Sequence, residues 1–197
     1  MSWPNRITVL RLLLVPVFVL LVLSAADAAM YRYAALALVV VIGICDAADG
    51  IIARRTGRVT KIGSLLDPLA DKALMISALV TLSLRGALSA EHPDLGVPGW
   101  AAVVLVSRDL FMLVGAAILF FLVGFFQAMP SGVGKAATVA QFVAIGFTLA
   151  SPDLVRWFPA ATWTGLHIVW VLTVALGVIS WLGYLRTGSK LLSAGGH

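Results

Sequence analysis

Apolar stretches of close to twenty residues recur along almost the whole chain, and they constrain its fold more than any other feature. Hydrophobic residues make up 61% of the sequence, whereas charged residues make up only 12%. A small soluble core does not need runs of this length, but a helix needs about 20 apolar residues to cross a bilayer. We therefore expect an all-α integral membrane protein rather than a soluble helical domain.

Polar, Pro and Gly residues divide these stretches into six expected transmembrane helices. The first follows the short basic start Met1–Arg6 and ends near Leu23; a cleaved signal peptide is the alternative, but Arg11 lies inside this run. The other five are expected at about 31–53, 64–84, 99–126, 134–150 and 163–185, with loops at 85–97 and 152–159 and a frayed tail. The connectors are short, so we expect residues 1–197 to form a single transmembrane domain.

Basic residues in the expected loops indicate the orientation. Six spans place both termini on one side, together with Arg6, Arg54, Arg55, Arg58, Lys61, Lys135, Arg186 and Lys190. Fewer basic residues fall on the other side, namely Arg32, Arg85 and Arg156. Because cytoplasmic loops are enriched in Lys and Arg, we expect cytoplasmic termini in a bacterial-type plasma membrane. This bias accounts for the net charge of +5, and the sequence contains no nucleic-acid-binding motif.

Four of the nine acidic residues lie between positions 46 and 71, at the facing ends of the expected second and third helices. Asp46 and Asp49 are three residues apart, and Asp67 and Asp71 are four apart, so each pair shares a helix face. Ionisable residues within apolar spans usually face an interior cavity. Converging carboxylates repel unless a cation offsets them, and oxygen ligands without His or Cys suit Mg²⁺, Mn²⁺ or Ca²⁺. Helix capping is the alternative, but it needs neither four aspartates nor one a full turn inside a helix.

The spacing Asp-x2-Asp-Gly-x2-Ala-Arg-x8-Gly-x3-Asp-x3-Asp, from Asp46 to Asp71, resembles the complete signature of the CDP-alcohol phosphotransferase family (CDP-alcohol phosphatidyltransferase class I). All the signature residues are present without a shift in spacing. A second, weaker pattern near the start of the chain resembles the phosphatidylglycerophosphate and cardiolipin synthase branch of this family; it consists of Pro4, Asn5, Thr8 and Arg11.

The resemblance implies an enzyme of phospholipid biosynthesis that transfers a phosphatidyl group from CDP-diacylglycerol to an alcohol and releases CMP. It also implies a homodimer and a polar, metal-binding cavity open to the cytoplasm, with Mg²⁺ or Mn²⁺, two ions in all. The implied metal ligands are Asp46, Asp49, Asp67 and Asp71, and Asp71 is also the expected general base. The implied CDP-binding residues are Asp49, Gly50, Ala53, Arg54, Gly63 and Asp67. The expected acceptor-binding residues are Thr8, Arg11, Arg58, Arg108 and Lys135.

The acceptor is expected to be phosphatidylglycerol, which would make the chain a CMP-forming cardiolipin synthase. Phosphatidylglycerophosphate synthases commonly carry Arg-Glu in the fourth span and a further arginine one or two turns later. This chain has Arg108-Asp109 and, in the later region, Ala116. The segments S-R-D, L-D-P-L-A-D-K and G-K-A-A-T also resemble cardiolipin synthases. Glycerol 3-phosphate remains the alternative acceptor.

Several residues have a plainer interpretation beside the functional one. Arg108 could form a structural pair with Asp109, Lys135 could be an ordinary interfacial lysine, and Lys72 is expected to snorkel or to pair with a carboxylate. Cys45 is expected to be a small buried residue rather than a reactive thiol. Two other protein classes remain: a cation-binding transporter, which needs charges along a path across the membrane, and a noncatalytic scaffold, which does not need the signature.

Overall fold

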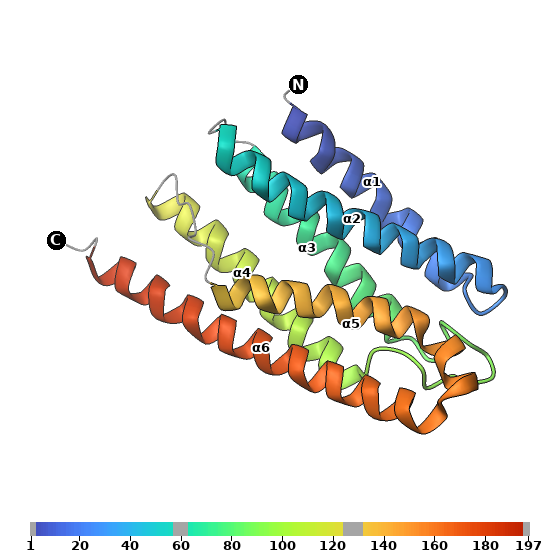
Figure 1. Ribbon diagram of the computed structural model, residues 1–197. Helices are drawn as coiled ribbons and strands as arrows, with labels where there is room; N and C mark the ends of the chain where they lie inside the picture. The colour runs from blue at the N-terminus through green and yellow to red at the C-terminus, as the bar shows by residue number, and fades with distance from the viewer. Residues whose placement is uncertain (1–2, 57–62, 124–131, 195–197) are drawn as a thin grey trace.

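The chain forms a bundle of α-helices in a computed structural model that describes residues 3–56, 63–123 and 132–194 (Figure 1). The side chains of residues 3–9, 11, 46–56, 63–71, 116, 118–123 and 187–194 lie outside that description. The described residues form α1 (Trp3–Leu23), α2 (Ala29–Thr56), α3 (Gly63–Leu82), α4 (Gly99–Val123), α5 (Gly132–Trp157) and α6 (Pro159–Ala194). The expected all-α fold and the expected loop between the third and fourth helices are therefore confirmed.

The six helices close into a ring. The main packing contacts run from α1 to α2, then to α5, α6, α4 and α3, and α3 returns to α1. Helices α5 and α6 form an antiparallel hairpin, in which the Thr173 hydroxyl donates to the Ala140 carbonyl at 3.4 Å. Large apolar side chains such as Phe18, Leu79 and Trp170 are fully buried between the helices. Many other apolar residues face outward, as expected for helices surrounded by lipid.

The expected loop at 152–159 is wrong, because α5 continues through Pro152 to Trp157. Proline has no backbone N–H, so Pro152 cannot donate to the Thr148 carbonyl four residues earlier. The Ser151 hydroxyl donates to that carbonyl instead, at 2.7 Å. Ser and Thr side chains are known to satisfy backbone groups freed by a membrane-helix proline. The chain then turns at Phe158, and α6 begins at the next residue.

Two further expectations need correction. The tail after residue 185 is not frayed throughout, because α6 continues to Ala194. A single glycine, Gly188, interrupts an otherwise helix-compatible sequence there. Cys45 is exposed rather than buried. Each helix of the ring has a face that points away from the other helices. Cys45 lies on that face of α2, next to the exposed Ile44.

The described structure contains two helices that could cross a membrane by length and composition. They are α5 and the Pro159–Arg186 part of α6. Shorter apolar segments occur in the described parts of the first three helices, at Leu12–Leu23, Ala29–Cys45 and Lys72–Leu82. The six-span topology therefore remains a prediction.

Candidate functional site

The four signature aspartates lie at one end of the bundle, on two helices that both pack against α1. Asp46 and Asp49 belong to the last three turns of α2, and Asp67 and Asp71 belong to the first three turns of α3. Figure 1 shows the end of α2 and the start of α3 at the same end of the bundle as the start of α1 and the end of α6. The helix assignment thus agrees with the expected position of the site, although the aspartate side chains lie outside the described residues.

The other residues of the expected CDP and acceptor sites are distributed over the same helices. Gly50, Ala53 and Arg54 lie in the last two turns of α2, and Gly63 is the first residue of α3. Thr8 and Arg11 lie on α1, near its start. Arg58 falls in the segment 57–62, outside the described residues.

The signature residues offer a donor set that fits a hard divalent cation. Four carboxylates without His or Cys provide only oxygen ligands, which Mg²⁺ and Mn²⁺ prefer. Among the described side chains, no three His, Cys, Asp or Glu residues gather to form another metal site. The aspartates of α2 and α3 are therefore the candidate ligands that the sequence and the helix placement support.

A buried ionic network of described side chains lies next to this region. Asp109 on α4 has no exposed surface, and its Oδ1 atom accepts from Lys72 Nζ of α3 at 2.8 Å. The same oxygen accepts from the Arg108 guanidinium at 3.2 Å. Arg108 is 4% exposed and also donates to the Ser180 hydroxyl of α6, at 3.5 Å. The network thus connects three helices, and its α3 member directly follows Asp71 in the chain.

The sequence predicts that Lys72 snorkels or pairs with a carboxylate, but it does not identify Asp109 as that carboxylate. Asp109 is expected to pair with Arg108 alone. The scarcity of acidic residues in the expected spans is a signal that one buried carboxylate serves two cations. The packing of α3 against α4 is what brings these residues together.

The remaining expected acceptor residue, Lys135, is exposed on the first turn of α5. Two polar side chains that sequence reasoning did not single out lie inside the bundle: the Gln141 amide nitrogen on α5 and the Tyr184 hydroxyl on α6. Both atoms are buried and have no hydrogen-bond partner among the described residues. The sequence does not single out these two residues, because each lies in an apolar span without a motif around it.

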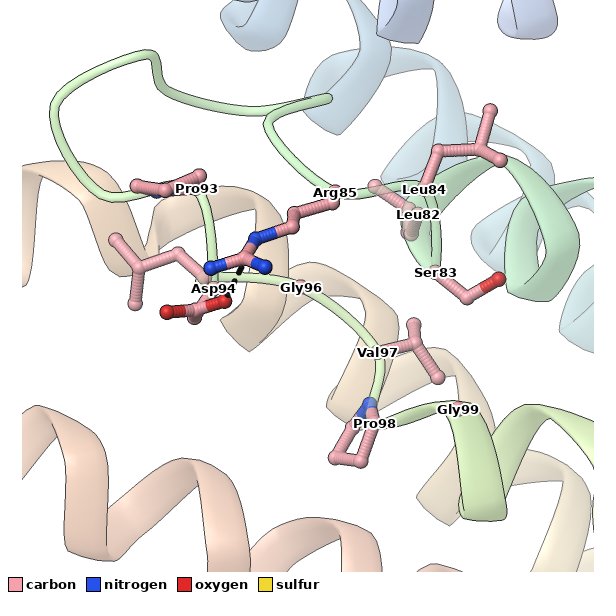
Figure 2. Close-up of a pocket in the computed structure, with 11 residues that line it drawn as sticks. Leu82, Ser83, Leu84, Arg85, Pro93, Asp94, Gly96, Val97, Pro98 and Gly99 are labelled. Atoms are coloured by element: carbon pink, nitrogen blue, oxygen red, sulfur yellow. Dashed lines mark ion pairs between the residues drawn. The ribbon is translucent and has the colours of Figure 1, made fainter.

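A pocket of about 300 Å³ lies at the other end of the bundle, in the loop between α3 and α4. Figure 2 shows Arg85 and Asp94 facing each other across it. Their ion pair of 3.2 Å is largely exposed, with 77% and 66% of the two side chains accessible. This pocket lacks a carboxylate cluster and is far along the helices from the signature, so it is not the candidate active site.

Comparison with known proteins identifies the family. The family model for CDP-alcohol phosphatidyltransferase matches residues 1–181. The chain belongs to the CDP-alcohol phosphatidyltransferase family. The match covers all six helices except the end of α6, and the resemblance inferred from the aspartate spacing is therefore confirmed.

Relatives within the family carry two kinds of name. A probable phosphatidylglycerophosphate synthase of Mycobacterium tuberculosis is 38% identical over 144 residues, which cover 72% of this chain and 63% of the relative. A putative cardiolipin synthase of Mycobacterium bovis is 34% identical over 151 residues, covering 77% of this chain and 63% of the relative. The chain thus spans less than two thirds of the length of these two relatives.

A third relative is matched over nearly its full length. The CDP-diacylglycerol–glycerol-3-phosphate 3-phosphatidyltransferase of Pseudomonas fluorescens is 33% identical over 209 residues, covering all of this chain and 95% of the relative. Members of the family with both names therefore resemble this chain to a similar degree, and similarity alone does not select an acceptor.

Proposed function

We propose that this protein transfers the phosphatidyl group of CDP-diacylglycerol to a glycerol-containing acceptor and releases CMP. The observation that carries the proposal is the complete aspartate signature at the adjoining ends of α2 and α3, in a chain that belongs to this family. We propose further that all six helices span the membrane and that the signature end faces the cytoplasm, where CDP-lipid head groups are accessible.

The reaction forms one bond to phosphorus and breaks another. The acceptor hydroxyl oxygen attacks the phosphatidyl phosphorus, and the bond from that phosphorus to the bridging diphosphate oxygen breaks, so that CMP leaves. Asp71 takes the hydroxyl proton. Asp46, Asp49, Asp67 and Asp71 would hold two divalent ions, which neutralise the diphosphate and the leaving phosphate.

Small residues of the signature make room for the nucleotide. Gly50 and Gly63 lack side chains and so allow the close approach of cytidine, beside Ala53. Arg54 contacts phosphate or orients an aspartate, and Asp49 and Asp67 lie next to the same diphosphate. Thr8, Arg11 and Arg58 complete the acceptor side, with Arg108 and Lys135 as the principal cations for its phosphate.

Phosphatidylglycerol is the acceptor that the residues of α4 favour. Phosphatidylglycerophosphate synthases commonly carry a further arginine one or two turns after the position of Arg108, and this chain has Ala116 in that region. The loss of one cation suits the monoanionic phosphodiester of phosphatidylglycerol better than the dianion of glycerol 3-phosphate. Glycerol 3-phosphate is the second candidate, because the Pseudomonas fluorescens relative named for that acceptor is matched over 95% of its length.

Product analysis tests the proposal. Purified protein is supplied with CDP-diacylglycerol, Mg²⁺ or Mn²⁺, and either phosphatidylglycerol or glycerol 3-phosphate, and CMP and lipid products are measured. We expect CMP and cardiolipin with the first acceptor. Phosphatidylglycerophosphate as the main product would select the second candidate. Absence of CMP release with both acceptors would contradict the proposed activity.

A further inference from the structure

We propose that Asp109 is a positioning residue for the acceptor site, acting through Lys72 and Arg108. This inference rests on the proposed function. It assigns roles to Asp109 and Lys72, which are not part of the aspartate signature. Asp109 would not contact an anionic acceptor itself, because a carboxylate repels a phosphate. Its effect would come from holding two cations in place.

The geometry shows how one carboxylate holds both cations. Lys72 Nζ and the Arg108 guanidinium bond to the same oxygen, Asp109 Oδ1, at 2.8 and 3.2 Å. Two positive charges so close together repel each other, and the shared carboxylate offsets that repulsion. Without the Asp109 charge, we expect Lys72 and Arg108 to move apart, and α3 and α4 to lose their ionic connection.

The network retains unused hydrogen-bonding capacity. Arg108 Nε and Asp109 Oδ2 are buried without a partner among the described residues. A guanidinium carries five N–H donors, and the described bonds use only those directed to Asp109 and Ser180. If the network served only to join helices, hydrogen-bond partners for Arg108 Nε and Asp109 Oδ2 would increase its stability. The unused donors of Arg108 are instead suited to bind an anionic ligand.

The Arg108 side chain is also held from the α6 side. A Cβ atom added at Gly177 would lie 3.7 Å from Arg108 Cδ and 3.0 Å from Leu105 Cδ2. The close contact is with Leu105, whereas the distance to Arg108 is an ordinary van der Waals contact. The stem of Arg108 therefore lies against α6 near Gly177, and from there its guanidinium reaches Ser180. Asp109 and α6 together leave Arg108 little conformational freedom.

The network is connected to the proposed chemistry through α3. Lys72 follows Asp71, the proposed base, and the peptide bond between them is part of the same helix. An ionic bond from Lys72 to α4 therefore holds the segment of α3 that carries Asp71. Positioning of the acceptor phosphate by Arg108 and of the base by α3 would both depend on the Asp109 carboxylate.

The test compares Asp109→Asn with the wild-type protein in mixed micelles, with each substrate varied in turn. We expect the acceptor KM to rise about tenfold, as for the loss of a charge-assisted hydrogen bond, and the CDP-diacylglycerol KM to stay within about twofold. In a background that carries both Lys72→Met and Arg108→Ala, Asp109→Asn should have little further effect on the acceptor KM, because it acts through these two cations. Unchanged acceptor KM in folded Asp109→Asn, or an undiminished effect of Asp109→Asn in that background, would overturn the proposal.

A matched control is available at the other end of the bundle. Asp153→Asn breaks the ion pair of 2.7 Å with Arg32, which is 4% exposed, and so removes a comparable contact between α2 and α5. This variant should lower the melting temperature but leave the acceptor KM unchanged. An equal rise in acceptor KM for both variants would show that Asp109 has only a general structural role.

Two additions keep the test decisive. If Asp109→Asn does not fold, Lys72→Met preserves the stem of the side chain and should still raise the acceptor KM several-fold; no rise would overturn the proposal. Stabilisation of the protein by a short-chain phosphatidylglycerol, measured as a rise in melting temperature without CDP-diacylglycerol, provides a readout without turnover. The rise should occur in wild type and Asp153→Asn and be lost in Asp109→Asn. Wild-type protein that is stabilised but releases no CMP would contradict the proposed function alone.

Discussion

Single residues of the bundle interior are held by hydrogen bonds that cross between helices. Trp170 on α6 is fully buried, and its indole N–H donates to the Thr148 hydroxyl of α5 at 3.1 Å. That hydroxyl in turn donates to the Ala144 carbonyl of its own helix, at 2.8 Å. A buried indole N–H that loses its acceptor has no water to replace it. The Thr148 hydroxyl thus joins α5 to α6 at their centre.

Thr148→Val should therefore destabilise the protein, by about 1 kcal/mol, because it leaves the Trp170 N–H unpartnered. Thr162→Val is the matched control: Thr162 is also buried, but among the described residues its hydroxyl bonds only to the Phe158 carbonyl, within its own helical turn, at 2.8 Å. Melting temperatures in detergent would measure the difference. Equal melting temperatures for the two variants would mean that the interhelical bond contributes nothing net.

Asp71 is the residue on which the proposed proton transfer depends. Asp71→Asn should lower kcat by on the order of 10²-fold or more while leaving CDP-diacylglycerol binding largely intact, because the base is needed in the transition state. Steady-state kinetics and a separate binding measurement would distinguish the two effects. Asp94→Asn, in the exposed loop at the other end, serves as the control and should retain full activity. Loss of nucleotide binding without a change in kcat would assign Asp71 to the CDP site instead.

At the scale of elements, the loop between α3 and α4 closes the end of the bundle away from the signature. Its backbone returns to the end of α3, where Val97 N–H donates to the Leu82 carbonyl at 2.9 Å. Gly86, with φ of 77°, turns the chain and bonds to the Pro93 carbonyl at 2.8 Å. Leu88 and Leu95 of this loop are buried against the bundle. The connection is thus a packed part of the fold.

Gly96→Ala should destabilise this closure by about 1–3 kcal/mol, as overpacking typically does. A Cβ atom at Gly96 would lie 2.5 Å from the Leu82 carbonyl oxygen, which is backbone and cannot rotate away. Gly99→Ala is the control, since a Cβ there meets nothing within 4 Å. Thermal unfolding in detergent measures both. A Gly96→Ala protein as stable as the control would show that the loop accommodates the extra methyl group.

At the scale of the whole molecule, the proposed orientation explains the arrangement of basic residues. Arg32, on the side expected to face away from the cytoplasm, is paired with Asp153, and Arg85 is paired with Asp94. Two of the three exceptions to the charge bias are therefore neutralised by carboxylates at the same end. Acidic residues contribute little to membrane orientation, so the prediction of a cytoplasmic signature end rests on the Lys and Arg bias itself.

Cysteine labelling in intact cells tests this orientation. In a Cys45→Ala background, which removes the only native cysteine, Thr56→Cys at the end of α2 should resist a membrane-impermeant reagent applied from outside. Asp94→Cys, in the exposed loop, should react with it. Labelling of both proteins after permeabilisation is the control. The reverse pattern would contradict the proposed orientation and the access of cytosolic head groups to the site.

Metal dependence is also a property of the assembled molecule, because its candidate ligands come from two helices. Chelation of divalent ions should abolish CMP release, and Mg²⁺ or Mn²⁺ should restore it, since the charge of the diphosphate is neutralised by the ions that the carboxylates hold. Added Mg²⁺ or Mn²⁺ should leave the melting temperature unchanged in a variant that lacks all four aspartates. Full activity in chelator would contradict the metal assignment.

The sequence by itself determined the properties that depend on neighbouring residues. Hydropathy and helix breakers predicted the starts of the helices to within about four positions, whereas α5 and α6 continue seven and nine residues beyond their expected ends. Aspartate spacing identified the family and located the signature at the ends of α2 and α3. Both signals are local, because a helix repeats every few residues and the expected ligands lie on two consecutive helices.

Only the tertiary structure decided which distant residues meet. Lys72 and Asp109 are 37 positions apart, and Arg32 and Asp153 are 121 apart, and nothing in their neighbouring sequence pairs them. Their contacts follow from the order of the helices around the ring, which apolar periodicity does not encode because every helix has a similar apolar surface. Packing geometry, rather than residue pattern, specifies such contacts.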